Sequence, residues 1–168
     1  MSETTDESTA RTRRPTGPVP AAGRRINPSA LSSIQKATLR RTMNASFDDE
    51  TLRLLDETRE VRIETRRDGD SPEHRTIIWV VVVEGEVFVR SVRGAKGRWY
   101  REISSNPEGA LHVQDDRIPV RAASAAEGAT VDAVSAAFRS KYQRSSPAST
   151  EAMVRPEVLP TTLKLSPA

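Results

Sequence analysis

The sequence predicts a mainly β protein with flanking helices, built as a small barrel of six strands in a single domain and preceded by a disordered N-terminal tail. Between residues 60 and 166, six short segments either alternate apolar and polar side chains or consist of β-branched residues, and turn-forming residues separate them. Only two stretches of this region have the patterning of a full helix. Before residue 47, large apolar side chains are nearly absent. Many short strands with few helices are typical of a small barrel.

Composition divides the chain into a tail, residues 1–46, and one domain, residues 47–168. A chain of 168 residues with 36% hydrophobic content is long enough for one core plus an extension. The tail contains eight Lys or Arg side chains and three acids, a net charge of +5, whereas the domain carries 18 basic and 20 acidic side chains, a net charge of −2. The tail has too little apolar surface to offset chain entropy and is therefore expected to be disordered.

Charge and cysteine content exclude several classes of function. A domain with a slightly negative net charge lacks the basic surface that nucleic-acid binding requires, so we expect nucleic acid to bind weakly and through the tail alone, with a solvated extension as the alternative. No apolar run approaches the ~20 residues that span a bilayer and no segment resembles a signal peptide, which predicts a cytoplasmic protein without a membrane partner. The absence of cysteine excludes a disulfide framework and a thiolate nucleophile.

The first elements of the domain are a short helix and two strands. Ser46 and Asp49 are spaced as in a capping box, and the neighbouring acids favour a helix over residues 48–56. Residues 60–66 alternate as a half-buried strand does. The DGD turn that follows predicts a return of the chain in a strand over residues 75–83.

The apolar run IIWVVVV at residues 77–83 predicts a strand that is covered on both faces, at the centre of the sheet or barrel. A tight EGE turn connects this run to a strand over residues 87–92, which completes a hairpin. We expect a helix over residues 98–105, because Pro107 disfavours helical geometry at the residue before it.

Two strands, a helix and a closing strand complete the domain. Residues 110–114 and 117–123 alternate as strands, and Pro119 predicts an edge position or a bulge for the second of them. Thr130 is suited to cap a helix that ends near residue 143. Residues 144–160 are expected to form a loop with one helical turn, and residues 161–166 a closing strand.

A glycine-rich basic loop, SVRGAKG at residues 91–97, leads into an aromatic segment, WYRE. Guanidinium groups and backbone amides beside glycines bind phosphate, and aromatic rings stack on planar molecules, so the combination suits a phosphorylated planar cofactor. Other chemistry finds little support. The two histidines lack metal-ligand spacing, GAKG lacks the spacing of a Walker loop, and Ser91 has no base partner in the sequence.

The HRTIIWVVVVEGEVFVRSVRG hairpin, the GRWYREISSNP segment and the terminal MVRPE and TTLKL segments resemble a bacterial family of unknown function within the FMN-binding split-barrel superfamily. That superfamily includes pyridoxamine-phosphate oxidases and deazaflavin-dependent nitroreductases. The resemblance covers residues 47–167 and implies a six-stranded split β-barrel, FMN or a deazaflavin coenzyme as cofactor, and a homodimer. In the deazaflavin branch, a serine-glycine turn is followed by a tryptophan-tyrosine segment and an Asn-Pro pair. The residues of this chain that match this pattern are Ser91, Gly94, Trp99, Tyr100, Asn106 and Pro107.

The candidate cofactor-binding residues combine this match with basic residues at the strand ends and on the hairpin. Arginines and a histidine would surround the phosphate, glycines would let backbone amides approach it, and two aromatic rings would cover the ring system. The full set is Arg66, His74, Arg75, Thr76, Arg90, Ser91, Arg93, Gly94, Gly97, Trp99 and Tyr100. The alternative is that the arginines form a solvated face and that the tryptophan belongs to the core.

Two functions from different classes remain open. The first is a flavin- or deazaflavin-dependent oxidoreductase, in which the cofactor supplies the chemistry and the protein orients it, with no catalytic side chain identified and no metal expected. The second is a noncatalytic module that binds a cofactor or another anionic ligand. Deazaflavin-binding relatives carry a glycine-lysine-serine-glycine turn where this chain has RRDGDSPEHRT, and this difference favours the second function.

Overall fold

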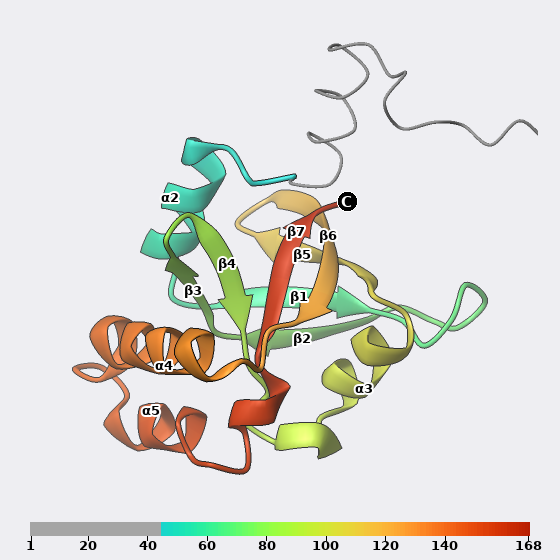
Figure 1. Cartoon of the computed structure of the whole chain (residues 1–168). Helices are drawn as coiled ribbons and strands as arrows, with labels where there is room; N and C mark the ends of the chain where they lie inside the picture. Colours follow the sequence, from blue (N-terminus) through green and yellow to red (C-terminus); the bar gives the residue numbers. More distant parts are fainter. Residues whose placement is uncertain (1–44) are drawn as a thin grey trace, which may run out of the picture. The chain divides into compact units, whose positions relative to one another are not determined.

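The structure is a computed structural model that describes residues 45–168. Seven strands form one antiparallel sheet with helices packed around it (Figure 1). The strands are β1 (Val61–Thr65), β2 (His74–Ile78), β3 (Val80–Val83), β4 (Glu86–Val89), β5 (Glu108–Val113), β6 (Asp116–Ser124) and β7 (Leu163–Pro167). The helical segments are α2 (Asp49–Glu57), η2 (Gly94–Lys96), α3 (Arg98–Ser105), α4 (Gly128–Tyr142), α5 (Pro147–Met153) and η3 (Leu159–Thr161).

The predicted class, mainly β with flanking helices, is confirmed, but residues 45–168 contain seven strands rather than six. Nearly all of the predicted tail, residues 1–46, lies outside the described residues, so its disorder and the domain boundary stay predictions. Among residues 45–168, no helix is both long enough and apolar enough to cross a membrane.

The additional strand arises because the apolar run at residues 77–83 is broken at Trp79. The strand order is β2-β1-β5-β6-β7-β4-β3, so the two halves of this run, β2 and β3, lie at opposite ends of the sheet. The chain leaves its pairing with β1 at Ile78 and pairs with β4 from Val80 onward. The predicted central position is therefore wrong, and Ile77 of β2 is 57% exposed. The two edge strands, β2 and β3, are thus consecutive in sequence but do not pair with each other, and the sheet is split between them.

The C-terminal end of α4 covers the free backbone groups at this break. The Tyr142 hydroxyl accepts a hydrogen bond from Val80 N at 3.3 Å and lies 2.7 Å from Arg59 O. Lys141 Nζ donates to Val80 O at 2.9 Å and to Leu55 O at 2.7 Å. Buried backbone groups need such partners, so these two side chains make the break compatible with a packed interior.

Two hydrophobic clusters lie on the two sides of the strands. In the main core, α2 contributes Leu55 and α3 contributes Trp99 and Ile103. The smaller cluster joins α4 and α5 to the hairpin of β3 and β4, and its buried members are Val81, Phe88, Val134, Phe138, Tyr142 and Met153. Close packing in both clusters fixes the helices against the split sheet.

Several elements differ from the sequence-based expectations. Helix α4 begins at Gly128 with Glu127 at its N-cap, so the predicted cap at Thr130 is wrong. Strand β4 ends at Val89 rather than residue 92, because Arg90 turns into the interior and Ser91 N donates to Thr161 Oγ1 at 3.1 Å. The region 144–160, predicted to be mainly loop, contains α5, which starts with a proline in its first turn, where the missing N–H is tolerated. Strand β6 lies between β5 and β7 rather than at an edge, and its pairing with β7 begins at Val120, one residue after Pro119.

A buried carboxylate joins four neighbouring strands. Glu64 of β1 is 2% exposed. Its carboxylate oxygens lie 3.2 Å from Arg75 Nη2 of β2, 2.6 Å from His112 Nε2 of β5 and 2.6 Å from Arg117 Nη2 of β6. Burial would raise the pKa of Glu64, but hydrogen bonds from Arg117 and His112 outweigh burial and lower the pKa to about 2. The ionised carboxylate therefore cross-links these strands.

Replacing Glu64 with glutamine is expected to lower the free energy of unfolding by about 2 kcal/mol at neutral pH, since charged hydrogen bonds are lost while the half-exposed arginines regain water. The folded pKa lies below the ordinary 4.5, so the contribution of this carboxylate is complete above pH 4.5 and disappears as the pH falls toward 2. Urea unfolding at several pH values measures this difference. The matched control is E108Q, which loses only the exposed pair with Arg121; an equal effect of both variants would contradict the prediction.

Candidate functional site

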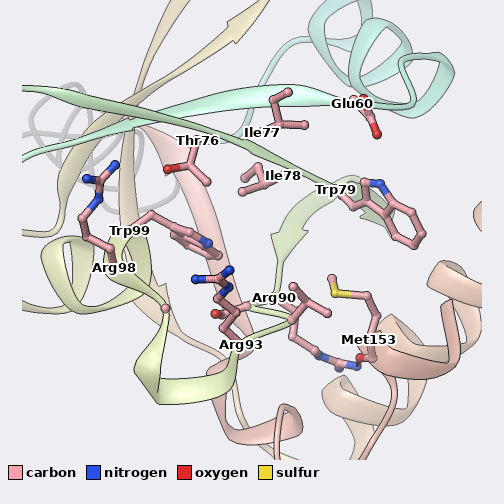
Figure 2. A pocket seen from close by; sticks show the side chains of 13 residues that line it. Glu60, Thr76, Ile77, Ile78, Trp79, Arg90, Arg93, Arg98, Trp99 and Met153 are labelled. Atoms are coloured by element: carbon pink, nitrogen blue, oxygen red, sulfur yellow. Dashed lines mark hydrogen bonds between the residues drawn. The ribbon is translucent and has the colours of Figure 1, made fainter. Parts of the chain in front are cut away.

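A cavity of about 620 Å³ opens at the split of the sheet. The bend between β2 and β3 forms one wall, and the segment that joins β4 to α3 forms the other (Figure 2). Its lining residues are Glu60, Thr76, Ile77, Ile78, Trp79, Arg90, Ser91, Val92, Arg93, Gly97, Arg98, Trp99 and Met153. The volume lies in the range of sites that bind small molecules and cofactors.

Arg90 anchors the β4 wall of the cavity from behind. The residue is 1% exposed, and its guanidinium points toward Met153 and away from the open space (Figure 2). It donates to Thr162 Oγ1 at 2.9 Å, Met153 O at 2.9 Å, Ser135 Oγ at 3.1 Å and Val131 O at 3.3 Å. Four of its five N–H groups are thus used within the chain, and burial lowers its pKa to about 10. The Arg90 guanidinium is therefore turned away from the open space in which the sequence predicted a phosphate, and the residue positions the wall.

Ser91 places an unpaired hydroxyl at the cavity wall. The residue is 1% exposed, and its Oγ has no hydrogen-bond partner among the described residues. A Cβ atom at position 97 would clash with this oxygen, so Gly97 is the residue that leaves room beside it. Gly94 has a φ of +58°, a conformation that favours glycine, and its N–H closes the turn onto Ser91 O at 2.8 Å. A buried hydroxyl without a partner is unusual in a folded protein, so Ser91 Oγ has a hydrogen-bonding capacity that a water or a ligand can satisfy.

Two exposed arginines belong to the segment that follows Ser91. Arg93 and Arg98 both line the cavity, and within residues 45–168 neither side chain takes part in an ion pair or a hydrogen bond. Figure 2 shows the Arg93 guanidinium beside the Trp99 ring, with Arg98 further along the same wall. Helix α3 begins at Arg98, and no side chain caps its N-terminus. Its first N–H groups and two free cations favour an anion next to the Ser91 hydroxyl.

The other predicted basic residues are engaged elsewhere. Arg66 forms an ion pair with Glu73, and Arg75 lies 3.2 Å from the Glu64 carboxylate. His74 Nδ1 lies 3.0 Å from Glu102 Oε1, although the geometry is not that of a hydrogen bond. None of these three side chains lines the cavity, so the structure does not bring them to the phosphate position that the sequence suggested.

Of the eleven predicted residues, the structure brings Thr76, Arg90, Ser91, Arg93, Gly97 and Trp99 to the cavity. Gly94 shapes the turn behind it, and Tyr100 packs edge-on against Trp99, with ring centroids 6.1 Å apart. Sequence reasoning missed Arg98, although this residue lies directly after the glycine loop. It also missed the residues that the break in the apolar run exposes to the cavity, and the uninterrupted run gave no signal of that break.

Comparison with known proteins identifies the family and the fold. The chain belongs to a bacterial family described as uncharacterized proteins conserved in bacteria (DUF2255), whose model matches residues 51–165. This membership confirms the predicted bacterial family. A search of curated proteins found no match.

Solved structures with low sequence identity share the split-barrel fold. A "putative pyridoxamine 5'-phosphate oxidase" from Listeria innocua is similar with a TM-score of 0.51 and 14% identity, over 71% of this chain and 91% of that chain. Campylobacter jejuni ChuZ gives a TM-score of 0.51 and 11% identity, over 78% of this chain and 53% of that chain, about half of its length. The conserved hypothetical protein Rv2991 from Mycobacterium tuberculosis gives a TM-score of 0.49 and 15% identity, over 74% of this chain and 81% of that chain. The two structures with a TM-score of 0.51 confirm the predicted split barrel.

The anchoring role of Arg90 predicts a stability effect that the cavity arginines lack. Replacing Arg90 with methionine leaves several buried acceptors unpaired and is expected to lower the free energy of unfolding by about 3 kcal/mol or more. The matched variant R93M removes an exposed guanidinium and should change it by less than about 0.5 kcal/mol. Urea unfolding compares the two variants. Amide hydrogen exchange at Ser91 should become faster in R90M, and equal unfolding energies would contradict the anchoring role.

Proposed function

We propose that this member of the DUF2255 family binds a phosphorylated, planar redox cofactor, FMN or a deazaflavin coenzyme, in the cavity at the split and acts as an oxidoreductase. The observation that carries the proposal is the unpaired, buried Ser91 hydroxyl, which lies at the cavity wall beside Gly97 and two free arginines. This group of donors fits the anionic end of a cofactor, and an unpaired buried hydroxyl does not stabilise the packed interior.

The anionic group would lie at the start of α3. Arg93 and Arg98 supply forked donors with a permanent charge, and the Ser91 hydroxyl supplies a neutral donor from the same cavity lining. The first N–H groups of α3 add the positive end of the helix dipole. Since Gly97 keeps side-chain atoms out of this space, a phosphate oxygen could approach the backbone closely.

The planar part of the cofactor would extend along the apolar wall. Trp99 is a core residue that is 6% exposed and also lines the cavity, and Ile77 and Ile78 line it from β2. Flat apolar walls with a few placed donors are the usual character of cofactor sites. The likeness of the fold to the Listeria innocua protein, and the resemblance of the sequence to split-barrel oxidases and reductases, agree with this class of ligand.

When bound, a flavin-type cofactor supplies hydride transfer, and the protein contributes binding, orientation and exclusion of water. In this chain the arginines and Ser91 would fix the anionic end, and Trp99 would fix the plane of the ring. A hydride transfer of this kind requires no acid or base from a side chain.

A noncatalytic binding module is the second candidate, and one observation favours it. The turn that precedes β2 carries Arg66 and Arg67. Arg66 forms an ion pair with Glu73, and neither arginine lines the cavity, so the turn supplies no cation to the cavity wall. Turnover separates the two candidates. The protein is an oxidoreductase if it binds FMN or the deazaflavin coenzyme and reoxidises the reduced cofactor with an electron acceptor. Binding without turnover would identify a noncatalytic binding module.

We also propose a homodimer whose second subunit covers the rim of the cavity. Ile77 and Val92 are the large hydrophobic residues that remain markedly exposed in the described part of the chain, at 57% and 46%, and both line the cavity. Exposed apolar side chains at one site indicate an interface or a ligand.

Removing the cavity cations should weaken cofactor binding. The variant R93Q/R98Q is expected to bind FMN at least about tenfold more weakly than the wild-type chain, because each lost charge-assisted hydrogen bond contributes about 1.5–3 kcal/mol. The matched control is K96Q, which removes an exposed cation from the same loop without touching the cavity. Thermal shift across FMN concentrations measures the affinities. An equal loss of FMN affinity in R93Q/R98Q and K96Q would show that the effect comes from the overall charge of the protein and would contradict the prediction.

The rim predicts a specific dimer defect. Replacing Ile77 with lysine places a charge in the proposed contact and should shift the protein toward monomer, as measured by light scattering after size-exclusion chromatography. The control A129K adds the same charge at an exposed position of α4. A wild-type chain that is monomeric at all tested concentrations would refute the dimer, and an unaffected I77K dimer would refute its location.

A further inference from the structure

The end of the cavity away from the arginines has a different chemical character. Figure 2 shows Trp79, Met153 and Glu60 at this end, whereas Arg98 and Thr76 lie at the opposite end. All five residues line the same cavity. A cavity with cations at one end and an aromatic, acidic environment at the other is built for more than one kind of ligand group.

Trp79 presents a rigid aromatic surface. Tyr142 stacks on one face of its indole, with centroids 4.1 Å apart and planes 3° apart. The Tyr142 hydroxyl is itself held by Val80 N and Arg59 O. The half-buried indole is therefore fixed on one side and accessible on the side of the cavity that it lines. A preorganised ring of this kind binds planar groups and cations without losing much conformational entropy.

Glu60 supplies a free negative charge beside this ring. It follows α2 and precedes β1, its side chain is exposed, and within residues 45–168 it takes part in no ion pair or hydrogen bond. Arg59 and Lys141 do not line the cavity, and Lys141 donates to Leu55 O and Val80 O. Arg90 lines the cavity, but its guanidinium is buried behind the wall and donates to Met153 O. The carboxylate is the acidic group that faces a ligand at this end.

We propose that Trp79, Met153 and Glu60 form a second binding site within the cavity, for a ligand with a flat apolar body and a protonated amine. The body would lie between the Trp79 indole and the Met153 thioether, which makes favourable contacts with aromatic rings. The amine would pair with the Glu60 carboxylate. The role of this ligand as the substrate of the oxidoreductase rests on the proposed function. The binding of the ligand does not depend on that function.

Tryptamine and indole-3-propionate test the site, since the two probes share a ring and differ in charge. Calorimetric titration of the full chain should give at least about tenfold tighter binding of tryptamine. E60Q should bring the two probes within about twofold of each other, while the control E57Q, an exposed acid of α2 outside the cavity, should leave the preference unchanged. Equal affinities of the probes for the wild-type chain, or a preference that survives in E60Q, would overturn the proposal.

The two tryptophans of the chain locate the ligand independently. In NMR spectra, tryptamine should shift the indole N–H signal of Trp79 and leave that of Trp99 in place, with the signals assigned through W99F. A response at Trp99 alone would overturn the proposal. FMN is titrated separately. If FMN fails to bind while tryptamine still shifts Trp79 in a Glu60-dependent manner, the second site stands and the proposed cofactor function fails.

Discussion

The buried guanidinium of Arg90 is the constraint on which the candidate site depends. Its hydrogen bonds join the end of β4 to α4, to the last residue of α5 and to the start of the closing strand. A buried charge is costly unless its donors are satisfied, so these elements can pack only in the arrangement that satisfies them. The next residue is Ser91. Its position at the cavity wall, and the turn that brings Arg93 and Arg98 to the same wall, follow from this anchoring.

The second constraint is the break at Trp79, which creates the open side of the barrel. A fully closed sheet would pair β2 with β3, whereas here the same stretch of chain forms both edges and the cavity lies at the gap. Tyr142 and Lys141 satisfy the backbone of Val80, so that the gap does not leave unpaired polar groups in the interior. Stability and a ligand-sized opening are thus compatible within one small fold.

Local patterns predicted the elements well where the cause is local. Alternation identified β1, β5 and β6, and Pro107 marked the end of α3 at Ser105 as observed. The loop at residues 91–97 could be identified as part of the candidate site, because glycines let the backbone turn and approach a ligand closely. The resemblance to split barrels supplied the architecture, which periodicity alone left as an unspecified small barrel.

Long-range causes were invisible in the sequence. Arg90 and Arg93 are the same residue type three positions apart, yet one is buried by contacts with residues 41 to 72 positions away and the other is free. Nothing in IIWVVVV marks a break at its tryptophan, because β-branched residues favour a strand on both sides. Arg66, His74 and Arg75 were assigned to the phosphate for their charge, but each pairs with or faces an acid. Glu73 is 7 positions from Arg66 and Glu64 is 11 positions from Arg75, whereas the acid that faces His74 is Glu102 of α3.

The comparison of FMN with riboflavin tests the central claim most directly, because the two molecules share the ring and differ by the phosphate. Calorimetric titration of the full chain should give FMN an affinity at least about tenfold higher than riboflavin, as expected for a phosphate held by two arginines and a buried hydroxyl. Equal affinities, or no binding of either molecule, would contradict the account.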